Sequence, residues 1–342
     1  MIRGWDLGGA HVKLAELDAD GHLVRAQQAP CRLWLGMDQL EQALLELGGG
    51  DVRHVRHAVT MTGELVDLFP DRAAGVDAII GTFLRVTGAQ DVVVLAGDAL
   101  VAPDEARARW HEVASANWRA TARLAARLAG EALVIDVGST TTDLMLVAGG
   151  IPVDGATDDH ERLAAQTLVY TGVVRTPLMA LARQAPFCGR TVGLMAEYFA
   201  TTGDVYRILG TLDPACDHAD TADGRGKSKA ESIVRLARMV GLDAAQASVA
   251  DWEALAAWFA RLQLDHIRHA CERQLSRSLI GNSAPVVGLG AGQFLAQRLA
   301  AELGRPHLDF ASLAGIAPEH AAAVGVCGPA FAVASLARTP RA

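Results

Sequence analysis

Two stretches of the sequence decide how this chain folds: IRGWDLGGAHVK (residues 2–13) and ALVIDVGSTTTD (residues 132–143). In each, an apolar run ends at an aspartate, a turn of small residues follows, and a second strand-like run begins. This pattern predicts a β-hairpin, because glycine and other small residues allow the backbone angles of a tight turn. Asp6 and Asp136 lie 130 residues apart. Because this spacing is far above that of solenoid repeats, the pattern predicts two duplicated domains.

The first half of the chain predicts a three-strand meander, followed by alternating helices and strands. The meander strands are expected at residues 2–7, 12–17 and 23–27. Apolar periodicity and turn residues then predict a helix at 38–47 with Asp38 as its cap, a strand at 55–60, a helix at 72–86, a strand at 91–96 and a long helix at 103–128.

The second half repeats the meander, with strands expected at 132–137, 141–147 and 151–153. Residues 159–279 predict mostly helix, broken by a polar stretch at 213–229. The elements expected after them are a strand at 285–289, a Gly-rich turn, a helix ending near residue 303 and a last apolar helix at 318–336.

These elements together predict an α/β protein made of two duplicated lobes with a cleft between them. The first lobe is expected at residues 1–129, with residues 315–338 packing back on it. The second lobe is expected at residues 130–314 and carries the helical segment as an insertion. Both aspartate loops are expected to line the cleft.

The composition excludes several classes of function. The chain has 342 residues, of which 51% are hydrophobic and 20% charged, which is enough for two globular domains. A net charge of -8 argues against general binding to nucleic acid or a membrane surface, but a small anion needs only local donors. Five scattered cysteines predict reduced thiols. With no apolar leader or membrane-length apolar run, we expect a cytoplasmic protein.

The two hairpin turns are candidate phosphate sites. A tight turn of small residues can present several backbone N–H groups in one concavity, and hydroxyl groups add further donors. Asp6 and Asp136, at the strand ends, are expected to hold Mg²⁺. Lys13 is expected to reach the same anion as a point charge. The phosphate-binding residues predicted in the turns are Gly8, Gly9, Gly138, Ser139, Thr140 and Thr141.

Alternatively, each turn is an ordinary hairpin whose aspartate accepts turn hydrogen bonds. A single loop would favour that interpretation. Two loops in matching positions favour phosphate binding instead.

Two other Gly-containing segments could also bind phosphate. Gly288, Gly290 and Gly292 follow an apolar strand and precede a helix, which suits an anion at a helix N-terminus, although a packing turn explains them equally well. In the polar stretch, Lys227 and Lys229 could close over a diphosphate. The alternative there is a solvated loop.

Several isolated polar and aromatic residues leave two interpretations open. Asp159 and Arg162, like Tyr170 and Arg175, are either substrate contacts or satisfied polar groups of the core. In the long helix, Trp118 is either a packing anchor or part of the cleft, which its neighbour Asn117 could face. The spacing of His54 and His57 does not favour a metal site.

The two loops, the duplication and the late Gly-rich turn resemble the superfamily of actin, sugar kinases and Hsp70, in its hydantoinase/oxoprolinase branch. Longer motifs resemble a narrower family, linked to tetrahydromethanopterin one-carbon metabolism, whose archaeal members are condensing enzymes of methanofuran biosynthesis. This resemblance spans residues 2–334. The motifs that carry it are SANWRAT (115–121), VIDVGSTTTD (134–143), LVYTGVVRTP (168–177), AEYFAT (196–201) and TADGRGKS (221–228).

This resemblance implies an alkyl or aryl transferase. The phenol oxygen of a tyramine or tyrosine derivative would attack an aminomethyl-furanmethyl diphosphate, forming an aryl ether and releasing diphosphate. The leaving diphosphate would need Mg²⁺, N–H groups and basic side chains, and the phenol would need a proton acceptor.

The resemblance also suggests roles for particular residues. Stabilisation of the leaving diphosphate is assigned to Asp6, Lys13, Asp136 and the second turn, with Mg²⁺ as the cofactor. For acceptance of the phenol proton, Glu64 and Asp98 are the candidate bases. The residues expected to contact the substrates are Asn117, Trp118, Tyr170, Arg175 and Gly290.

Two other classes of function remain open. The bare loops equally support an ATP-dependent kinase or ATPase, or a nucleotide sensor without catalytic activity. A nucleotide enzyme would need an adenosine pocket beside residues 288–292. The expected partners are small molecules rather than nucleic acid or membranes, and a homodimer is left open. The phenol substrate also stays open among tyrosine, tyramine and glutamylated tyramine.

Overall fold

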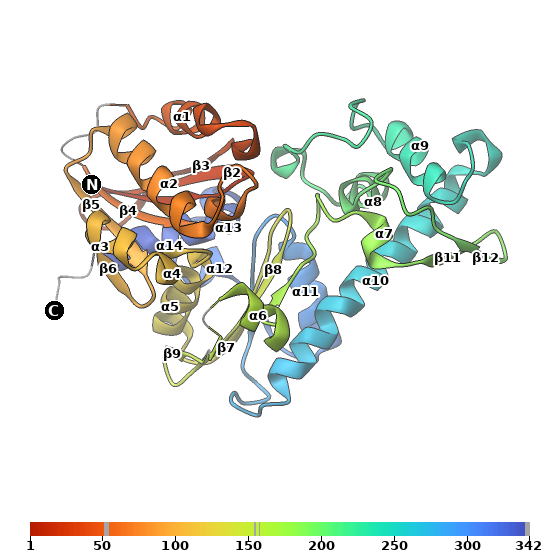
Figure 1. Cartoon of the computed structure of the whole chain (residues 1–342). Coiled ribbons are helices and arrows are strands. Elements are labelled where there is room, and N and C mark those ends of the chain that lie inside the picture. Colours follow the sequence, from red (N-terminus) through yellow and green to blue (C-terminus); the bar gives the residue numbers. More distant parts are fainter. Residues whose placement is uncertain (51–54, 154, 157, 339–342) are drawn as a thin grey trace.

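The first half of the chain builds a sheet around the hairpin that contains Asp6. The computed structural model describes residues 1–50, 55–153, 155–156 and 158–338 (Figure 1). Strand β1 pairs with β2 in antiparallel and with β4 in parallel, and β4 pairs in parallel with β5. The strands of this sheet, in the order β3-β2-β1-β4-β5-β6, are β1 (Ile2–Leu7), β2 (His11–Leu17), β3 (Leu23–Pro30), β4 (Arg56–Met61), β5 (Asp91–Ala96) and β6 (Ala99–Val101).

The second sheet repeats this arrangement around the hairpin that contains Asp136. Strand β7 pairs with β8 in antiparallel and with β13 in parallel, and β13 pairs in parallel with β14. The predicted duplication of the α/β core is therefore confirmed. The strands of this sheet, in the order β10-β8-β7-β13-β14 with β9 also paired to β8, are β7 (Ala132–Val137), β8 (Thr142–Ala148), β9 (Ile151–Pro152), β10 (Leu168–Val169), β13 (Val286–Leu289) and β14 (His307–Asp309).

Helices cover both faces of the first sheet. On one face, α1 (Met37–Glu46) and α2 (Arg72–Thr87) bury a cluster that includes Trp5 and Phe83. On the other face lies α14 (Gly328–Ala337), which also contacts α5 (Asn117–Ala129), a helix that packs mainly on β7, β8 and β9 of the second sheet. Helix α14 packs so closely on β1 that a Cβ at Gly4 would lie 2.0 Å from the carbonyl oxygen of Ala330.

One hydrophobic cluster joins the two sheets. It contains Leu95 of the first sheet, Val134 and Val287 of the second, and Phe331 of α14. Because close-packed interiors resist deformation, this shared core gives the opening strands a fixed base from which their aspartates project.

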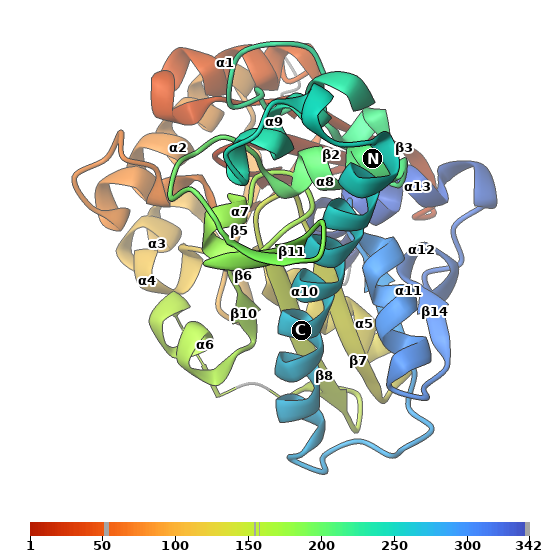
Figure 2. The same ribbon diagram turned by 90° about the vertical axis from the view of Figure 1, so that its right-hand side faces the viewer.

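The outer face of the second sheet is covered by the helical insertion. Figure 2 shows the long helix α10 running along this lobe, with the β11–β12 hairpin beside it. The elements of the insertion are α6 (Asp159–Ala165), α7 (Leu178–Leu181), β11 (Gln184–Phe187), β12 (Arg190–Gly193), α8 (Thr202–Leu209), α9 (Lys229–Met239) and α10 (Val249–Leu275). Helix α11 (Gln293–Glu302) follows strand β13. The prediction of mostly helix at 159–279 missed β10 and this hairpin, because strands of two to four residues carry too little periodicity to be detected.

The long helix predicted at 103–128 is wrong. The structure divides it into α3 (Pro103–Ala108), α4 (Trp110–Val113) and α5. The backbone turns at Ser115, whose φ is +53° and whose hydroxyl contacts the carboxylates of Glu64 and Asp159. Contacts with distant parts of the chain therefore break a helix that local propensity favours.

The last predicted helix is also two helices. After α12 (Phe310–Leu313), α13 (Pro318–Val326) and α14 meet at an angle of 99°. Gly328 stands at the bend because a Cβ there would lie 2.4 Å from Cδ1 of Leu289. In the described part of the chain no single helix is long and apolar enough to cross a membrane, and α13 and α14 reach that length only as this bent pair.

The predicted cap of α1 is likewise wrong. The helix begins at Met37, its cap residue is Gly36, and the side chain of Asp38 caps no amide there. The aspartate instead lies in the first turn, where a negative charge is favourable beside the helix dipole.

Candidate active site

Both aspartate loops line one cavity of about 460 Å³ between the sheets. The prediction that the cleft is lined by both loops is therefore confirmed. The residues that line it are Asp6, Gly8, Gly9, Ala10, His11, Lys13, Trp34, Thr62, Leu65, Val66, Asp67, Ser115, Asn117, Asp136, Gly138, Ser139, Thr140, Thr141, Asp143, Asp159, Arg162, Leu168, Tyr170 and Arg175.

The two turns have the same hydrogen-bonded form. The amide of Gly8 donates to the carbonyl oxygen of His11 at 3.0 Å, and that of Gly138 donates to the carbonyl of Thr141 at 2.8 Å. Inside each turn are amides that find no acceptor among the described residues, and all of them line the cavity. They belong to Gly9, Ala10, Ser139 and Thr140. Unpaired amides of this kind can bind an anion.

The second turn is braced by the segment 171–175. The carbonyl oxygen of Ser139 accepts hydrogen bonds from the amides of Val174 and Arg175, at 3.1 and 2.9 Å. A Cβ at Gly172 would lie 2.5 Å from the backbone nitrogen of Thr140, so only glycine allows this approach. This brace explains physically why a Gly-x-x-Arg sequence lies near the turn.

Asp6 and Lys13 form an ion pair at the floor of the cavity. They are register partners in β1 and β2, and Nζ of Lys13 lies 3.6 Å from Oδ2 of Asp6. Asp6 is only 3% exposed, and Nδ2 of Asn117 lies 3.4 Å from both of its oxygens. Burial raises the pKa of Asp6, although Lys13 opposes this shift. Burial alone would lower the pKa of Lys13, but Asp6 and Asp136 together outweigh it, so the pKa is raised and the amine stays charged.

Asp136 is a carboxylate without an ion-pair partner in the described part of the chain. Its register partner in β8, Asp143, instead accepts a hydrogen bond from Arg162 at 2.6 Å. Burial raises the pKa of Asp136 to about 7, Lys13 lowers it, and Asp143 and Asp6 raise it. The site therefore holds one carboxylate that is free to bind a ligand or a cation.

The late Gly-rich turn supports Asp136 from behind rather than lining the cavity. Gly290 has a φ of +88°, and a Cβ there would lie 2.2 Å from the carbonyl oxygen of Val137 and 2.5 Å from Oδ1 of Asp136. At Gly292, a Cβ would lie 2.6 Å from Cγ1 of Val137. Gly290, predicted to contact substrate, thus acts on the site through Asp136.

Replacing Gly290 by alanine should destabilise the protein by about 3–5 kcal/mol, since backbone strain and steric overlap add together. Gly304→Ala is the matched control, because Gly304 has a φ of +65° with nothing within 4 Å of an added Cβ. It should lose only about 1–2 kcal/mol, the cost of the left-handed backbone. Urea unfolding of both variants measures the difference. Equal losses would show that the turn relaxes without moving Asp136.

Trp118 is a packing residue and does not line the cavity. The guanidinium groups of Arg119 and Arg162 lie 4.6 and 4.3 Å from its ring centroid. Its neighbour Asn117 does face the cavity. The stacked tryptophan holds Arg162 against Asp143, so its effect on the site is indirect.

Glu64 lies one contact away from the cavity. It is 1% exposed, and its Oε1 lies 2.9 Å from the hydroxyl oxygen of Ser115. Ser115 lines the cavity, and the same hydroxyl oxygen lies 3.0 Å from Oδ2 of Asp159. Arg72 pairs with the same Asp159 oxygen at 2.7 Å, which links the two lobes. One hydroxyl hydrogen cannot be donated to two carboxylates. The Ser115 hydroxyl therefore donates to one of these carboxylates at a time, and burial raises the pKa of Glu64, which makes it a better proton acceptor than an exposed glutamate. Asp98, the other candidate base, does not line the cavity, and its side chain is 80% exposed.

The lysines of the polar stretch are not brought to the cavity. Lys227 donates to the carbonyl oxygen of Asp217 and lies 3.4 Å from its carboxylate, and Lys229 pairs with Glu253. Both charges are neutralised locally, so their placement gives no support to a role in binding diphosphate.

The aromatic residues at the mouth divide into predicted and unpredicted ones. Tyr170 lines the cavity and is 63% exposed. Arg175 lies over the ring of Trp34, 5.0 Å from its centroid, and has no carboxylate partner among the described residues. No sequence signal singles out Trp34.

Thr62, which also lines the cavity, could have been predicted from the sequence. It follows β4, the parallel neighbour of β1, and parallel strands place their carboxyl ends at one edge of a sheet.

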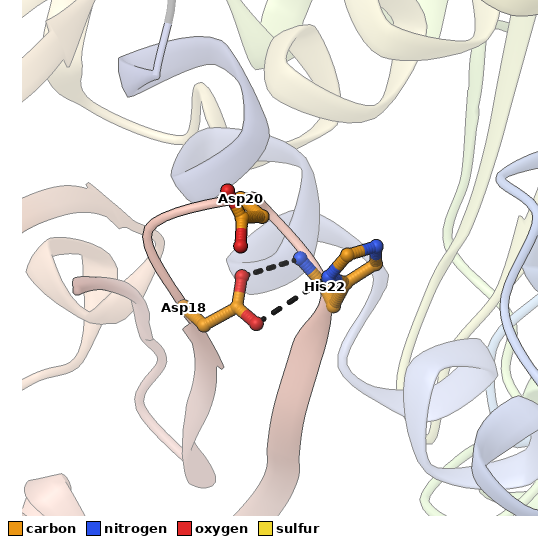
Figure 3. A group of neighbouring side chains, drawn as sticks. All are labelled: Asp18, Asp20 and His22. Atoms are coloured by element: carbon orange, nitrogen blue, oxygen red, sulfur yellow. Dashed lines mark hydrogen bonds and ion pairs between the residues drawn. The ribbon is translucent and has the colours of Figure 1, made fainter.

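Among the described side chains, no group of three potential metal ligands gathers around Asp136. In the described part of the chain, three potential metal ligands lie within 4.8 Å of one another only at Asp18, Asp20 and His22 (Figure 3). There the carboxylate of Asp18 accepts from the amides of Gly21 and His22, at 2.7 and 2.8 Å, as a hairpin turn requires. We assign no ion to this exposed turn. His54 lies outside the described residues, and Nδ1 of His57 accepts from Trp5 at 3.0 Å.

Comparison with known proteins identifies relatives over the whole chain. A family model described as hydantoinase/oxoprolinase matches residues 56–327. A protein of Methanocaldococcus jannaschii is 30% identical over 98% of this chain and 97% of its own length. A protein of Methanococcus vannielii is 28% identical over 60% of this chain and 89% of its own. Both are named (4-{4-[2-(gamma-L-glutamylamino)ethyl]phenoxymethyl}furan-2-yl)methanamine synthase.

Solved structures confirm the actin-like fold class. A nucleotide-free acetone carboxylase aligns with a TM-score of 0.56 over 98% of this chain and 70% of its own, at 12% identity. At that identity, the likeness extends to the fold alone.

Proposed function

The chain belongs to the hydantoinase/oxoprolinase family, and from that premise we propose that it is a transferase that joins an aminomethyl-furanmethyl diphosphate to a phenol oxygen. The named product of its relatives contains a phenoxymethyl group on a furan, which is the ether that this reaction would form. The proposal also places the chain in the biosynthesis of a methanofuran-like cofactor.

The reaction needs no oxidant and no nucleotide. The bond between the furanmethyl carbon and the diphosphate oxygen breaks, and its electron pair leaves with the diphosphate. The phenol oxygen forms the new bond to that carbon and gives up its proton. What the protein has to supply is charge stabilisation at the leaving oxygens and an acceptor for the proton.

The observation that carries the proposal is that both turns present unpaired amides to the cavity that Lys13 also lines. Amides fixed in two rigid turns need no reorganisation as negative charge develops on the leaving group, which is where such donors contribute most. The ammonium group of Lys13 adds a full positive charge at the same place. Trp34 and Tyr170 give the cavity aromatic walls for a furan and a phenol.

The residues present also fit Mg²⁺. This ion is usually bound through one or two carboxylates together with water and substrate phosphates. Asp136 offers a carboxylate with no ion-pair partner among the described residues, and Asp6 lies in the same cavity. When bound, the ion would neutralise part of the diphosphate charge.

The proton of the phenol has a path within the chain. Ser115 lines the cavity and contacts both Glu64 and Asp159. Glu64, our candidate base, would therefore act through the hydroxyl of Ser115 rather than by touching the substrate.

Product formation should consume no ATP, since the diphosphate supplies the leaving group. Incubation with a furanmethyl diphosphate, tyrosine or tyramine, and Mg²⁺ should release about one diphosphate per ether, measured by coupled assay and mass spectrometry. ADP formed in step with turnover would contradict this and support the kinase alternative. That alternative needs an adenosine pocket beside residues 288–292, yet these residues pack on β7 and none of them lines the cavity.

A further inference from the structure

A second, smaller cavity of about 130 Å³ adjoins the first, and we infer that it receives a carboxylate carried by the phenol substrate. This inference rests on the proposed function and specifies its acceptor. The two cavities share Ala10, His11, Trp34 and Arg175. A phenol whose hydroxyl points to the aspartate loops could therefore extend its tail past Trp34 into the smaller cavity.

Of the three arginines that line the smaller cavity, two already have carboxylate partners. Arg32 pairs with Asp220 at 2.8 Å. Arg207 binds both oxygens of Asp217, at 2.7 and 2.8 Å, and also pairs with Asp204 at 2.9 Å. Arg175 alone among them has no acidic partner in the described part of the chain.

Arg175 is held ready for a ligand. Its backbone amide binds Ser139, and its guanidinium group lies over the indole of Trp34. A guanidinium stacked on an aromatic ring keeps its N–H edge available, and that planar edge matches a carboxylate in bidentate fashion. The cavity thus offers one uncompensated positive charge.

Two imidazoles complete the pocket. The rings of His11 and His218 lie 5.2 Å apart, and Nε2 of His11 and Nδ1 of His218 are buried without a partner among the described residues. Burial, together with the nearby positive charges of Lys13 and Arg175, lowers the pKa of His11 to about 3, so this ring is neutral. A neutral imidazole can donate one N–H, and buried polar atoms normally have a partner. Orphaned nitrogens beside an unpaired guanidinium point to a missing anionic ligand.

The size and charge of this pocket favour a carboxylate over the diphosphate. Among the described residues it holds one cation without an acidic partner, and it has less than a third of the volume of the main cavity, where the unpaired amides and Lys13 already suit the diphosphate. The aminomethyl group of the furan is a cation and would be repelled by Arg175. Two phenols offer the required chemistry: tyrosine through its α-carboxylate, and a glutamyl tyramine through its glutamyl carboxylate.

The test compares three phenols at a fixed concentration of furanmethyl diphosphate: L-tyrosine, γ-glutamyltyramine and tyramine, which has no carboxylate. In the unmodified protein, one of the two acids should exceed tyramine in kcat/KM by about 10- to 100-fold, as one charge-assisted contact provides. Which acid is preferred identifies the source of the carboxylate. Arg175→Gln should remove that preference, so that within this variant the kcat/KM of the preferred acid falls to that of tyramine.

The matched control is Arg190→Gln, an exposed arginine on β12 outside both cavities, which should keep the preference. Equal turnover of tyramine and both acids by the unmodified protein would overturn the inference. So would an Arg175→Gln variant that loses all three phenols equally. If Arg175→Gln does not fold, Arg175→Lys keeps the charge without the planar edge and should lose at least about fivefold of the preference.

Calorimetric titration separates this inference from the proposed function. If no phenol yields an ether, the proposed reaction is wrong, but tighter binding of an acid than of tyramine, lost in Arg175→Gln, would still support the carboxylate pocket. Equal binding of the acids and tyramine would overturn it.

Discussion

Replacing Asp136 by asparagine should lower kcat by about 10²–10³-fold while making the metal-free protein more stable at neutral pH. The loss of rate follows from removing the free carboxylate beside the second turn, which we propose holds Mg²⁺ against the leaving diphosphate. The gain in stability follows because no ion pair satisfies this carboxylate in the described part of the chain.

The sign of the stability change comes from the pKa of Asp136. Burial raises it to about 7, whereas an aspartate in the unfolded chain titrates near 3.9. Between these values the folded state holds a proton that the unfolded state has lost, so this group lowers stability as the pH rises from about 4 to about 7. Asparagine removes that penalty, so the gain should be present at about pH 8 and absent near pH 4.

Thermal unfolding in EDTA at both pH values, with turnover measured in Mg²⁺, tests this pair of effects. Asp91→Asn, at the exposed start of β5, is the control and should change neither quantity. An Asp136→Asn variant with normal turnover and a lower Tm would mean that the residue is a structural turn aspartate. The diphosphate would then have to bind elsewhere.

Replacing Lys13 by methionine should lower both the rate and the stability, because it removes the positive charge that we propose acts on the diphosphate and leaves the buried Asp6 without its ion-pair partner. We expect kcat to fall by about 10–10²-fold, less than for Asp136 because Mg²⁺ would still neutralise part of the charge. Stability should fall by about 1–3 kcal/mol, since Asp6 would keep only its long contacts with Asn117.

The double variant Lys13→Met/Asp6→Asn separates the two effects. Its stability should recover towards that of the unmodified protein, because neither charge is left unpaired, while its activity should stay low. Urea unfolding and turnover of the single and double variants complete the cycle. Recovery of activity together with stability would show that Lys13 acts only by neutralising Asp6.

The double variant Lys13→Ala/Asp136→Ala should lose less in kcat than the product of the two single losses, because we propose that both residues act on one leaving group.

The strands and turns around Asp6 and Asp136 were predictable because their signals are local. An apolar run, an aspartate and a small-residue turn lie within twelve residues, and the same pattern recurs later in the chain. Strands β1, β5 and β7 have the predicted bounds. Duplication also predicts that equivalent loops meet at one cleft, because duplicated sheets present equivalent edges.

The two missed helix breaks differ in how far the sequence could have predicted them. Ser115 turns the backbone where its hydroxyl meets Glu64 and Asp159, and Gly328 bends the chain where Leu289 leaves no room for a Cβ. At Ser115 local propensity favours a continuous helix and tertiary contacts override it. At Gly328 the next residue, Pro329, lies in the first turn of α14 and is a local signal for a helix start that the prediction of one helix overlooked.

The sequence by itself determined the two-lobed fold and the two hairpin turns, because residues that make a hairpin are neighbours in the chain. Only the tertiary structure decided which charges are free. It pairs Lys227 and Lys229 with acids of their own lobe and places Glu64 behind Ser115. It also places Arg175 over Trp34, where no described acidic residue pairs with it. A charge becomes available to a ligand only when folding brings it no partner, and that depends on distances between residues that are remote in sequence.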